Sequence, residues 1–234
     1  MKNPVYSTVI DLVNRIEAMQ GEAIEAAALR MIETIEKGGL IQAYGAGHSY
    51  AGALELCHRA GGLIPTKAIK EPSGGQYETV EGVGTLFVKK VDIRPIDTVV
   101  VISNSGRNPL PVELAMGVKA KGATLIVITA VEASKNLPSK HSSGKNLYQL
   151  GDIVLDNLVV EGDAAIELPK SKNKVCGMSM LTTSLIIQAL TYRVAELLEE
   201  KGHVAPIYRS QNIDGGRAFN EALEAPYLDR LLRL

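Results

Sequence analysis

The chain has 234 residues, of which 46% are hydrophobic and 22% charged, and this composition excludes a disordered chain and predicts one large or two small folded domains. A formal net charge of -1, without a long basic run, argues against a nucleic-acid partner. The sequence begins without the pattern of a secretory signal, and no run of about 20 apolar residues could span a bilayer, so we expect a cytoplasmic protein with no membrane partner.

The first predicted element is helical. Apolar residues recur every three or four positions between residues 5 and 35, and the pattern stops at Gly38 and Gly39. One continuous helix of this length would extend roughly 50 Å, which is more than a compact domain needs. We therefore expect either a break near Gly21 or an arm that packs on another subunit.

Short apolar runs rich in β-branched residues predict the strands of a parallel sheet. Three of these runs are clear, at residues 40–44, 98–102 and 125–129. A weaker run lies at 153–155, and a candidate fifth strand lies at 62–65. Because parallel sheets bind ligands at the carboxyl ends of their strands, the loops that follow these runs are the places to look for a site.

Helical segments alternate with the predicted strands, and they lie at residues 50–60, 112–121 and 178–201. This alternation predicts right-handed β-α-β units and a doubly wound α/β sheet with helices on both faces. No linker divides the chain. We therefore expect one domain, 1–234, with an N-terminal helical arm, 1–37, and a C-terminal tail, 203–234.

The first loop with a chemical signature follows the first predicted strand. Its candidate ligand-binding residues are Gly45, Gly47, His48 and Ser49. Glycines let backbone N–H groups turn toward a ligand, and the N-terminus of the following helix favours an anion such as phosphate. A tight turn that needs glycine only for its backbone conformation is an equal alternative. A dinucleotide site is disfavoured because Tyr50 replaces the third glycine of the G-x-G-x-x-G pattern.

The second loop follows the next clear strand and precedes a helix. Its candidate ligand-binding residues are Ser103, Asn104, Ser105, Gly106 and Asn108. Two hydroxyls, two amides and a glycine at the end of a parallel strand can supply several neutral donors to phosphate oxygens. Such loops bind phosphate without a metal, so we expect no cofactor. The alternative is a helix cap in which Ser105 or Asn108 binds a free backbone N–H group and no ligand.

Taken in order, these loops resemble the SIS (sugar isomerase) domain of phosphosugar isomerases and regulators. The resemblance rests on three segments of the sequence, residues 45–49, 97–108 and 122–129. Three further segments are similar to uncharacterised bacterial SIS proteins that carry the label phosphoheptose isomerase, namely residues 141–148, 152–157 and 212–216. This closer resemblance covers almost the whole chain.

The resemblance implies a three-layer α/β/α sandwich of the flavodoxin-like type, with a five-stranded parallel sheet, that assembles as a dimer or tetramer. It also implies that Ser103, Ser105 and Asn108 hold the phosphate of the ligand. Asn108 stands where many SIS domains have Ser or Thr. An amide keeps a donor at this position but has a different reach from a hydroxyl.

The resemblance is weaker at the catalytic positions. In phosphoheptose isomerases the helix after the first loop carries a His and a Glu four residues apart, and a late helix supplies another His. The matching positions here hold Glu55 and Arg59, and the late helix carries Gln188 but no histidine. An isomerase still needs a base that moves a proton between adjacent carbons, so this sequence must supply it elsewhere.

The remaining acid–base candidates are His48, Glu55, Glu71 and Glu78. Each has a plainer alternative. His48 would serve as a hydrogen-bond donor to the phosphate or sugar, and Glu55 as a helix carboxylate in a structural hydrogen bond. Glu71 and Glu78 lie in a glycine-rich loop, where a solvated charge is the default.

The sequence predicts no metal site. Its histidines are scattered, and His141 and His203 lack any partner at ligand spacing. Cys57 and Cys176 have no C-x-x-C partner, which favours buried thiols over a zinc site. The polar segment 134–146 is either a cover that adds positive charge to a bound phosphate or a solvated connection.

Asn212 lies beside two glycines near the end of the chain. Glycines permit a tight turn, and such a turn would close one side of the sugar pocket, in its own subunit or in a neighbour's. A plain turn between two helices is the equal alternative.

Two functions remain open on the sequence. The first is an enzyme, namely an isomerase, or a lyase or etherase, that acts on a phosphorylated sugar or amino sugar. The second is a non-catalytic sensor that binds the same ligand. The long apolar stripes at 5–35 and 178–201 also predict a homodimer or homotetramer, because they exceed what one sheet face can cover.

Overall fold

The computed structural model describes residues 3–232, so the outermost residues of the predicted domain, 1, 2, 233 and 234, lie outside the described part. The centre of the molecule is a five-stranded sheet in the order β2-β1-β3-β4-β5, in which every neighbouring pair is parallel. Its strands are β1 (Ile41–Gly45), β2 (Thr66–Ile69), β3 (Thr98–Ile102), β4 (Thr124–Thr129) and β5 (Ile153–Asp156). The five-stranded parallel sheet is therefore confirmed.

One strand is displaced from its expected position. Strand β2 begins just after the segment 62–65, so the prediction of a strand there was wrong. Leu63 and Ile64 are buried, but they pair with the C-terminal tail rather than with β1. Leu63 forms an antiparallel bridge with Ile207, and the Ile64 N–H group donates to the carbonyl of Pro206 at 2.8 Å. The apolar run at 62–65 thus reflects burial under the tail.

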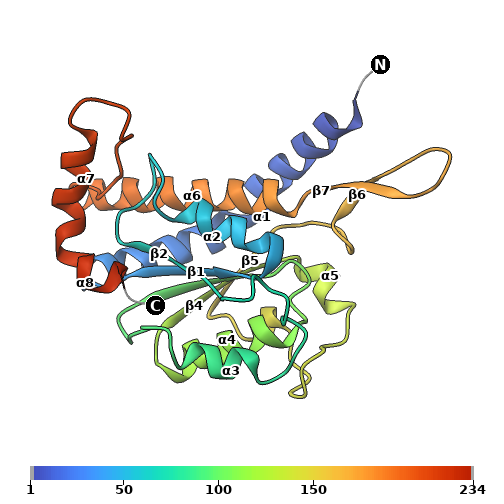
Figure 1. Ribbon diagram of the computed structural model, residues 1–234. Coiled ribbons are helices and arrows are strands. Elements are labelled where there is room, and N and C mark those ends of the chain that lie inside the picture. The colour runs from blue at the N-terminus through green and yellow to red at the C-terminus, as the bar shows by residue number, and fades with distance from the viewer. Residues whose placement is uncertain (1–2, 233–234) are drawn as a thin grey trace.

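Helices cover both faces of the sheet (Figure 1). One face carries α1 (Pro4–Glu36), α2 (Tyr50–Leu56) and α6 (Ser179–Glu200), and the other carries α3 (Val83–Val88) and α4 (Pro109–Ala120). Successive residues of a strand point to opposite faces, so in β3 Val99 and Val101 pack toward α3 and α4, whereas Val100 and Ile102 pack toward the other three helices. The predicted three-layer sandwich is confirmed.

Helix α1 is unbroken over 33 residues and runs through Gly21, so the predicted break is absent. No atom of residues 3–232 lies within 4 Å of the position that a Cβ atom of Gly21 would take, and a glycine inside a helix costs only about 1 kcal/mol. Nearby, Gln20 Oε1 accepts a hydrogen bond from the Asp156 N–H group at 2.9 Å, which ties the helix to the end of β5. The first turns extend beyond the sheet and leave Tyr6 and Ile10 exposed (Figure 1).

Several short elements were not predicted. Strands β6 (Ala164–Glu167) and β7 (Lys174–Gly177) form an antiparallel hairpin that projects from the body beside the N-terminal end of α1 (Figure 1). The others are α5 (Val131–Lys135), α7 (Gly216–Glu224), α8 (Leu228–Leu231) and the 3-10 turns η1 (Gly47–Ser49), η2 (Leu147–Gln149) and η3 (Ala225–Tyr227). Within the described residues, no helix is both long and apolar enough to cross a membrane.

A buried ion pair holds the C-terminal tail against the end of the sheet at which β3 begins. Asp97, which directly precedes β3, is 1% exposed, and Arg230 of α8 is 7% exposed. The guanidinium donates to both carboxylate oxygens of Asp97, at 2.8 and 2.6 Å. The same carboxylate accepts the N–H groups of Leu40, at 2.9 Å, and Arg94, at 2.8 Å. This one side chain therefore joins the approach to β1, the approach to β3 and the tail.

We predict that Arg230→Met destabilises the protein by about 3–5 kcal/mol, because it leaves the buried Asp97 carboxylate without its countercharge. The matched control is Arg217→Met, since Arg217 forms an exposed ion pair with Glu221, and exposed pairs contribute little to stability. Urea unfolding followed by circular dichroism measures both. Equal unfolding midpoints for the two variants would show that the buried pair contributes little.

Candidate functional site

The two loops singled out in the sequence lie side by side at one end of the sheet. They follow β1 and β3, which are paired in register with Gly45 opposite Ile102. Together they line one cleft of about 390 Å³. The predicted residues that line it are Gly47, His48, Ser49, Ser103, Asn104, Ser105 and Asn108. The two loops thus lie on one cleft of the chain.

The first loop is a tight turn that leads through η1 into α2. A Cβ atom on Gly45 would lie 2.2 Å from the carbonyl oxygen of Ser49, so no other residue fits there. Gly47 has a φ of +54°, a conformation that side chains disfavour. His48 is exposed at the mouth of the cleft. Gly45 itself lines a smaller neighbouring hollow of about 140 Å³ that Gly47 shares.

The second loop is held by the strand beside it. The Ser103 N–H group donates to the carbonyl of Ile128 at 3.1 Å, and Ser103 Oγ accepts the Gly106 N–H group at 3.3 Å. Asn104 Oδ1 accepts a hydrogen bond from Asn157 at 3.0 Å. Gly106 lies behind the cleft with a φ of +62°, and it shapes the loop rather than lining the cleft.

Asn108 occupies the N-cap position of α4, but its side chain does not cap the helix. Pro111 has no N–H group at the N3 position, and the Leu110 N–H group at N2 donates to the Glu78 carbonyl at 3.1 Å, so neither N–H group that an N-cap side chain binds is open to Asn108. The Asn108 side chain instead donates through Nδ2 to Glu78 Oε1 at 2.9 Å. Asn108 therefore does not cap α4.

Glu78 brings a third segment, the glycine-rich loop before α3, to the cleft. Burial raises the pKa of Glu78 above its ordinary value, against the charge of Lys140 and the Asn108 hydrogen bond, which both lower it. Glu71, the other candidate in this loop, holds the turn together by accepting hydrogen bonds from Ser73 and from the Gly75 N–H group. Burial raises the pKa of Glu71, but these hydrogen bonds outweigh it and leave that pKa below its ordinary value.

Besides Gly45 and Gly106, two more predicted site residues lie outside the cleft of their own chain. Glu55 forms an ion pair with Arg59 and accepts a hydrogen bond from Gln188 Nε2 of α6 at 2.6 Å. This arrangement matches its alternative role as a structural carboxylate. Asn212 is exposed in the C-terminal tail, which lies with α7 and α8 at the end of the molecule opposite the hairpin and α5 (Figure 1). Within one chain it therefore does not close the pocket.

One wall of the cleft, formed by the base of the hairpin and the start of α6, was not predicted from the sequence. Asp163 lies there with a φ of +68°. Its carboxylate accepts the N–H groups of Met178, at 2.9 Å, and Ser179, at 2.8 Å, and the Ser179 hydroxyl at 2.8 Å. Asp163 thus caps α6 from a distance of 15 residues along the chain. A cap supplied from so far away leaves no local sequence pattern.

Comparison with known proteins identifies residues 6–130 as a SIS domain. A UPF0309 protein of Listeria monocytogenes is 49% identical over 224 residues, which cover 96% of each chain. A UPF0309 protein of Geobacillus kaustophilus is 34% identical over 240 residues, which cover 99% of this chain and 96% of that one.

Among solved structures, a phosphoheptose isomerase from Neisseria gonorrhoeae matches 82% of this chain and 96% of its own, with a TM-score of 0.58 and 19% identity. One from Francisella tularensis matches 83% of this chain and 96% of its own, with a TM-score of 0.56 and 19% identity. At this identity the likeness establishes the fold alone. The family match and the close relatives, however, establish that this chain belongs to the SIS domain family and to its UPF0309 proteins.

Proposed function

We propose that the protein binds a phosphorylated sugar or amino sugar in this cleft and interconverts its aldose and ketose forms. One observation carries the proposal. A half-buried carboxylate with a raised pKa, Glu78, lies in the same cleft as the two hydroxyl-bearing residues Ser103 and Ser105. The cleft thus holds both parts that the reaction needs, which are a phosphate anchor and a proton acceptor.

The phosphate is bound by neutral donors in this proposal. Among the residues that the structure describes, no Lys or Arg lines the cleft, whereas Glu78, Glu161 and Asp163 do. The first turn of α4 has no N–H at its two prolines, so the side chains of the second loop must supply the donors. We assign this role to Ser103 and Ser105, with the NH₂ group of Asn104 beside them. Asn108 gives its own NH₂ group to Glu78 and so serves the phosphate less directly.

The proton transfer is assigned to Glu78. Its carboxylate takes the proton from the carbon next to the carbonyl group, which leaves an enediolate. The proton of the adjacent hydroxyl moves to the former carbonyl oxygen, and the Glu78 carboxyl returns its proton to the former carbonyl carbon. A raised pKa suits this work because the base must hold the proton and then release it. His48 at the mouth of the cleft would donate to the sugar oxygens or to the phosphate.

A second candidate function is a sensor that binds the sugar phosphate without turnover. It is favoured by the catalytic positions of phosphoheptose isomerases, which carry a His and a Glu four residues apart after the first loop and another His on a late helix. Here Glu55 and Arg59 stand at the first two of these places and form an ion pair, and α6 carries Gln188, which donates to Glu55, but no histidine. The experiments below separate the two functions.

We predict that the double variant Ser103→Ala and Ser105→Ala loses at least about a hundredfold in affinity for sugar phosphates, because each hydrogen bond to a charged group is worth about 1.5–3 kcal/mol. Isothermal titration calorimetry measures the affinity. Ser171→Ala is the matched control, since Ser171 lies exposed in the hairpin loop. If the double variant binds like the parent, the second loop is not the phosphate site.

We predict that Glu78→Gln lowers kcat by about 10²–10⁴-fold and changes KM little, as expected for loss of the acid–base group. Coupled assays across hexose, heptose and amino-sugar phosphates measure this, with Glu161→Gln as a control carboxylate of the same cleft. The parent should also lose activity as the pH falls through the raised pKa of Glu78. A parent that binds these ligands without turnover would favour the sensor.

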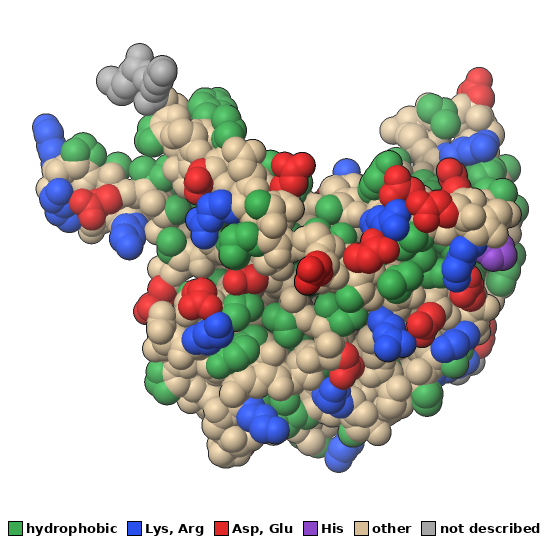
Figure 2. All heavy atoms as spheres, turned by 180° about the vertical axis from the view of Figure 1, so that it is seen from behind, with side chains coloured by type: hydrophobic (Ala, Val, Ile, Leu, Met, Phe, Trp, Pro, Cys, Tyr) green, Lys and Arg blue, Asp and Glu red, His purple; other side chains and the backbone are tan. Residues whose placement is uncertain are grey.

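We also infer that the protein forms a homodimer or homotetramer. Large apolar side chains are exposed on α1, where Tyr6 is 71% exposed, Ile10 60% and Met19 61%, and on α6, where Tyr192 is 67% exposed. Figure 2 shows a hollow on this side of the molecule, between the N-terminal end of α1 with the hairpin and the C-terminal tail. A second copy that fills the hollow would cover these side chains. Only such a copy would bring Asn212 to a cleft.

The expected result of sedimentation velocity is a dimer or larger assembly at micromolar concentration. The double variant Tyr6→Glu and Ile10→Glu should shift it toward monomer, because it buries charge in the interface. The matched control is Leu86→Glu on the opposite face of the sheet, where Leu86 is 65% exposed. A monomeric parent would contradict the assembly.

A further inference from the structure

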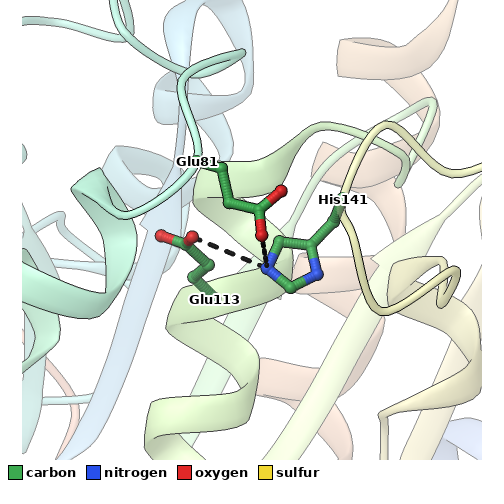
Figure 3. Close-up of side chains that lie close together, drawn as sticks. All are labelled: Glu81, Glu113 and His141. Carbon is green, nitrogen blue, oxygen red and sulfur yellow. Dashed lines mark ion pairs between the residues drawn. The ribbon is translucent and has the colours of Figure 1, made fainter.

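We propose that Glu81, Glu113 and His141 form a binding site for one divalent transition-metal ion of the zinc class. Figure 3 shows their side chains pointing toward one another from three segments of the chain. Glu81 lies in the loop before α3, Glu113 on α4, and His141 in the loop that follows α5. The site is separate from the cleft, and none of its residues lines the cleft.

The distances between the side chains fit a coordination shell better than hydrogen bonds. His141 Nε2 lies 3.5 Å from Glu81 Oε1 and 3.6 Å from Glu113 Oε1, which is at or beyond the limit for a hydrogen bond. Tetrahedral zinc, with bonds of about 2.0–2.1 Å, holds neighbouring ligand atoms about 3.3–3.4 Å apart. One ligand atom from each of the three residues lies within 4.8 Å of the other two. A small contraction would therefore bring them onto one ion.

Each ligand is already oriented by a partner of its own. The Glu81 carboxylate accepts the N–H and hydroxyl groups of Ser142. The Glu113 carboxylate accepts the N–H groups of Gly82, at 2.5 Å, and Thr85, at 2.8 Å. Such outer partners are typical of metal sites, and each carboxylate oxygen keeps a further lone pair for an ion.

The imidazole can present an unprotonated Nε2 to the ion. Its other nitrogen, Nδ1, lies 2.8 Å from Ser143 Oγ, which can accept the Nδ1 proton and so leave the Nε2 lone pair free. Nδ1 also lies 3.1 Å from the Ser143 N–H group, a contact that the ring gives up when Nδ1 carries the proton and Nε2 binds the ion.

The charge of the cluster also favours a cation. Glu113 is buried, with 3% of its side chain exposed. In the described part of the chain, neither Glu81 nor Glu113 forms an ion pair with any lysine or arginine, and His141 is the partner of both. The two carboxylates therefore lack a lysine or arginine countercharge in this part of the chain, and a divalent ion would supply one. Since 43% of the Glu81 side chain is exposed, an ion can reach the site and keep a water ligand.

The donor set selects the class of ion, because one imidazole and two carboxylates suit zinc and its transition-metal neighbours better than calcium. This proposal revises the expectation of no metal. The three ligands are separated by 32 and 28 residues, so no ligand-spacing motif could reveal them. A bound ion would fasten the loop that carries Glu78 to α4 and to the loop after α5.

The test begins with protein stripped by EDTA and dialysed, to which zinc chloride is added in a calorimeter. We expect one ion per chain, a higher Tm in the presence of zinc, and, with cobalt(II), an absorption spectrum typical of tetrahedral coordination. Changing an outer partner of a metal ligand already costs about 10–100-fold in affinity, so loss of a ligand in Glu81→Gln or His141→Ala should cost at least as much.

The matched control is His203→Ala, since His203 lies exposed beside Glu36 at 4.0 Å and offers surface binding only. It should bind zinc like the parent. Glu81→Gln changes a partly exposed side chain and leaves the contacts of Glu113 in place, so a folded variant is expected, and circular dichroism verifies it. A parent that takes up no stoichiometric zinc would overturn the proposal, as would ligand variants that bind zinc as tightly as the parent.

Discussion

The arrangement of the molecule depends on the buried carboxylate of Asp97. It binds the backbone at the start of β1, the turn before β3 and the guanidinium of Arg230 from the tail. Because β1 and β3 are thereby fixed together at their beginnings, the parallel register carries through to their ends, where Gly45 lies opposite Ile102. The two loops that form the cleft diverge from that point. The Asp97 contacts at the beginnings of β1 and β3 and the two cleft loops at their ends thus both depend on the pairing of these two strands.

The loop between β2 and α3 links the cleft to the rest of the chain. Glu71 stabilises the first turn of this loop by accepting a hydrogen bond from Ser73. Glu78 accepts a hydrogen bond from Asn108 at the cleft. Glu81 lies in the cluster with Glu113 of α4 and His141 of the loop after α5. Three carboxylates of one loop therefore have three different environments. Of the three, only Glu78 has a pKa above its ordinary value, because hydrogen bonds outweigh the effect of burial at Glu71 and Glu81, and a raised pKa is the property expected of a group that exchanges protons. The other two hold the loop in position.

Much of the fold could be predicted from the sequence because buried parallel strands are continuous apolar runs and the two loops carry glycines and hydroxyls. The same signal failed at residues 62–65, where the apolar run is buried under the tail, since burial alone does not distinguish a strand from a covered loop. Glu78 was one candidate among four, and its raised pKa depends on burial that no local pattern encodes. Asp163 and the cluster around His141 join residues far apart in sequence, so only the tertiary structure reveals them.

The most direct test of the proposed reaction is the exchange of substrate hydrogen with solvent. Hexose, heptose and amino-sugar phosphates would be incubated with the protein in D₂O, and proton NMR would follow the hydrogen on the carbon next to the carbonyl group. If Glu78 transfers a proton within the cleft, one of these ligands should gain deuterium at that carbon and convert to its isomer, and Glu78→Gln should abolish both changes. If the ligands bind but show neither deuterium uptake nor conversion, the cleft is a binding site and the isomerase proposal is contradicted.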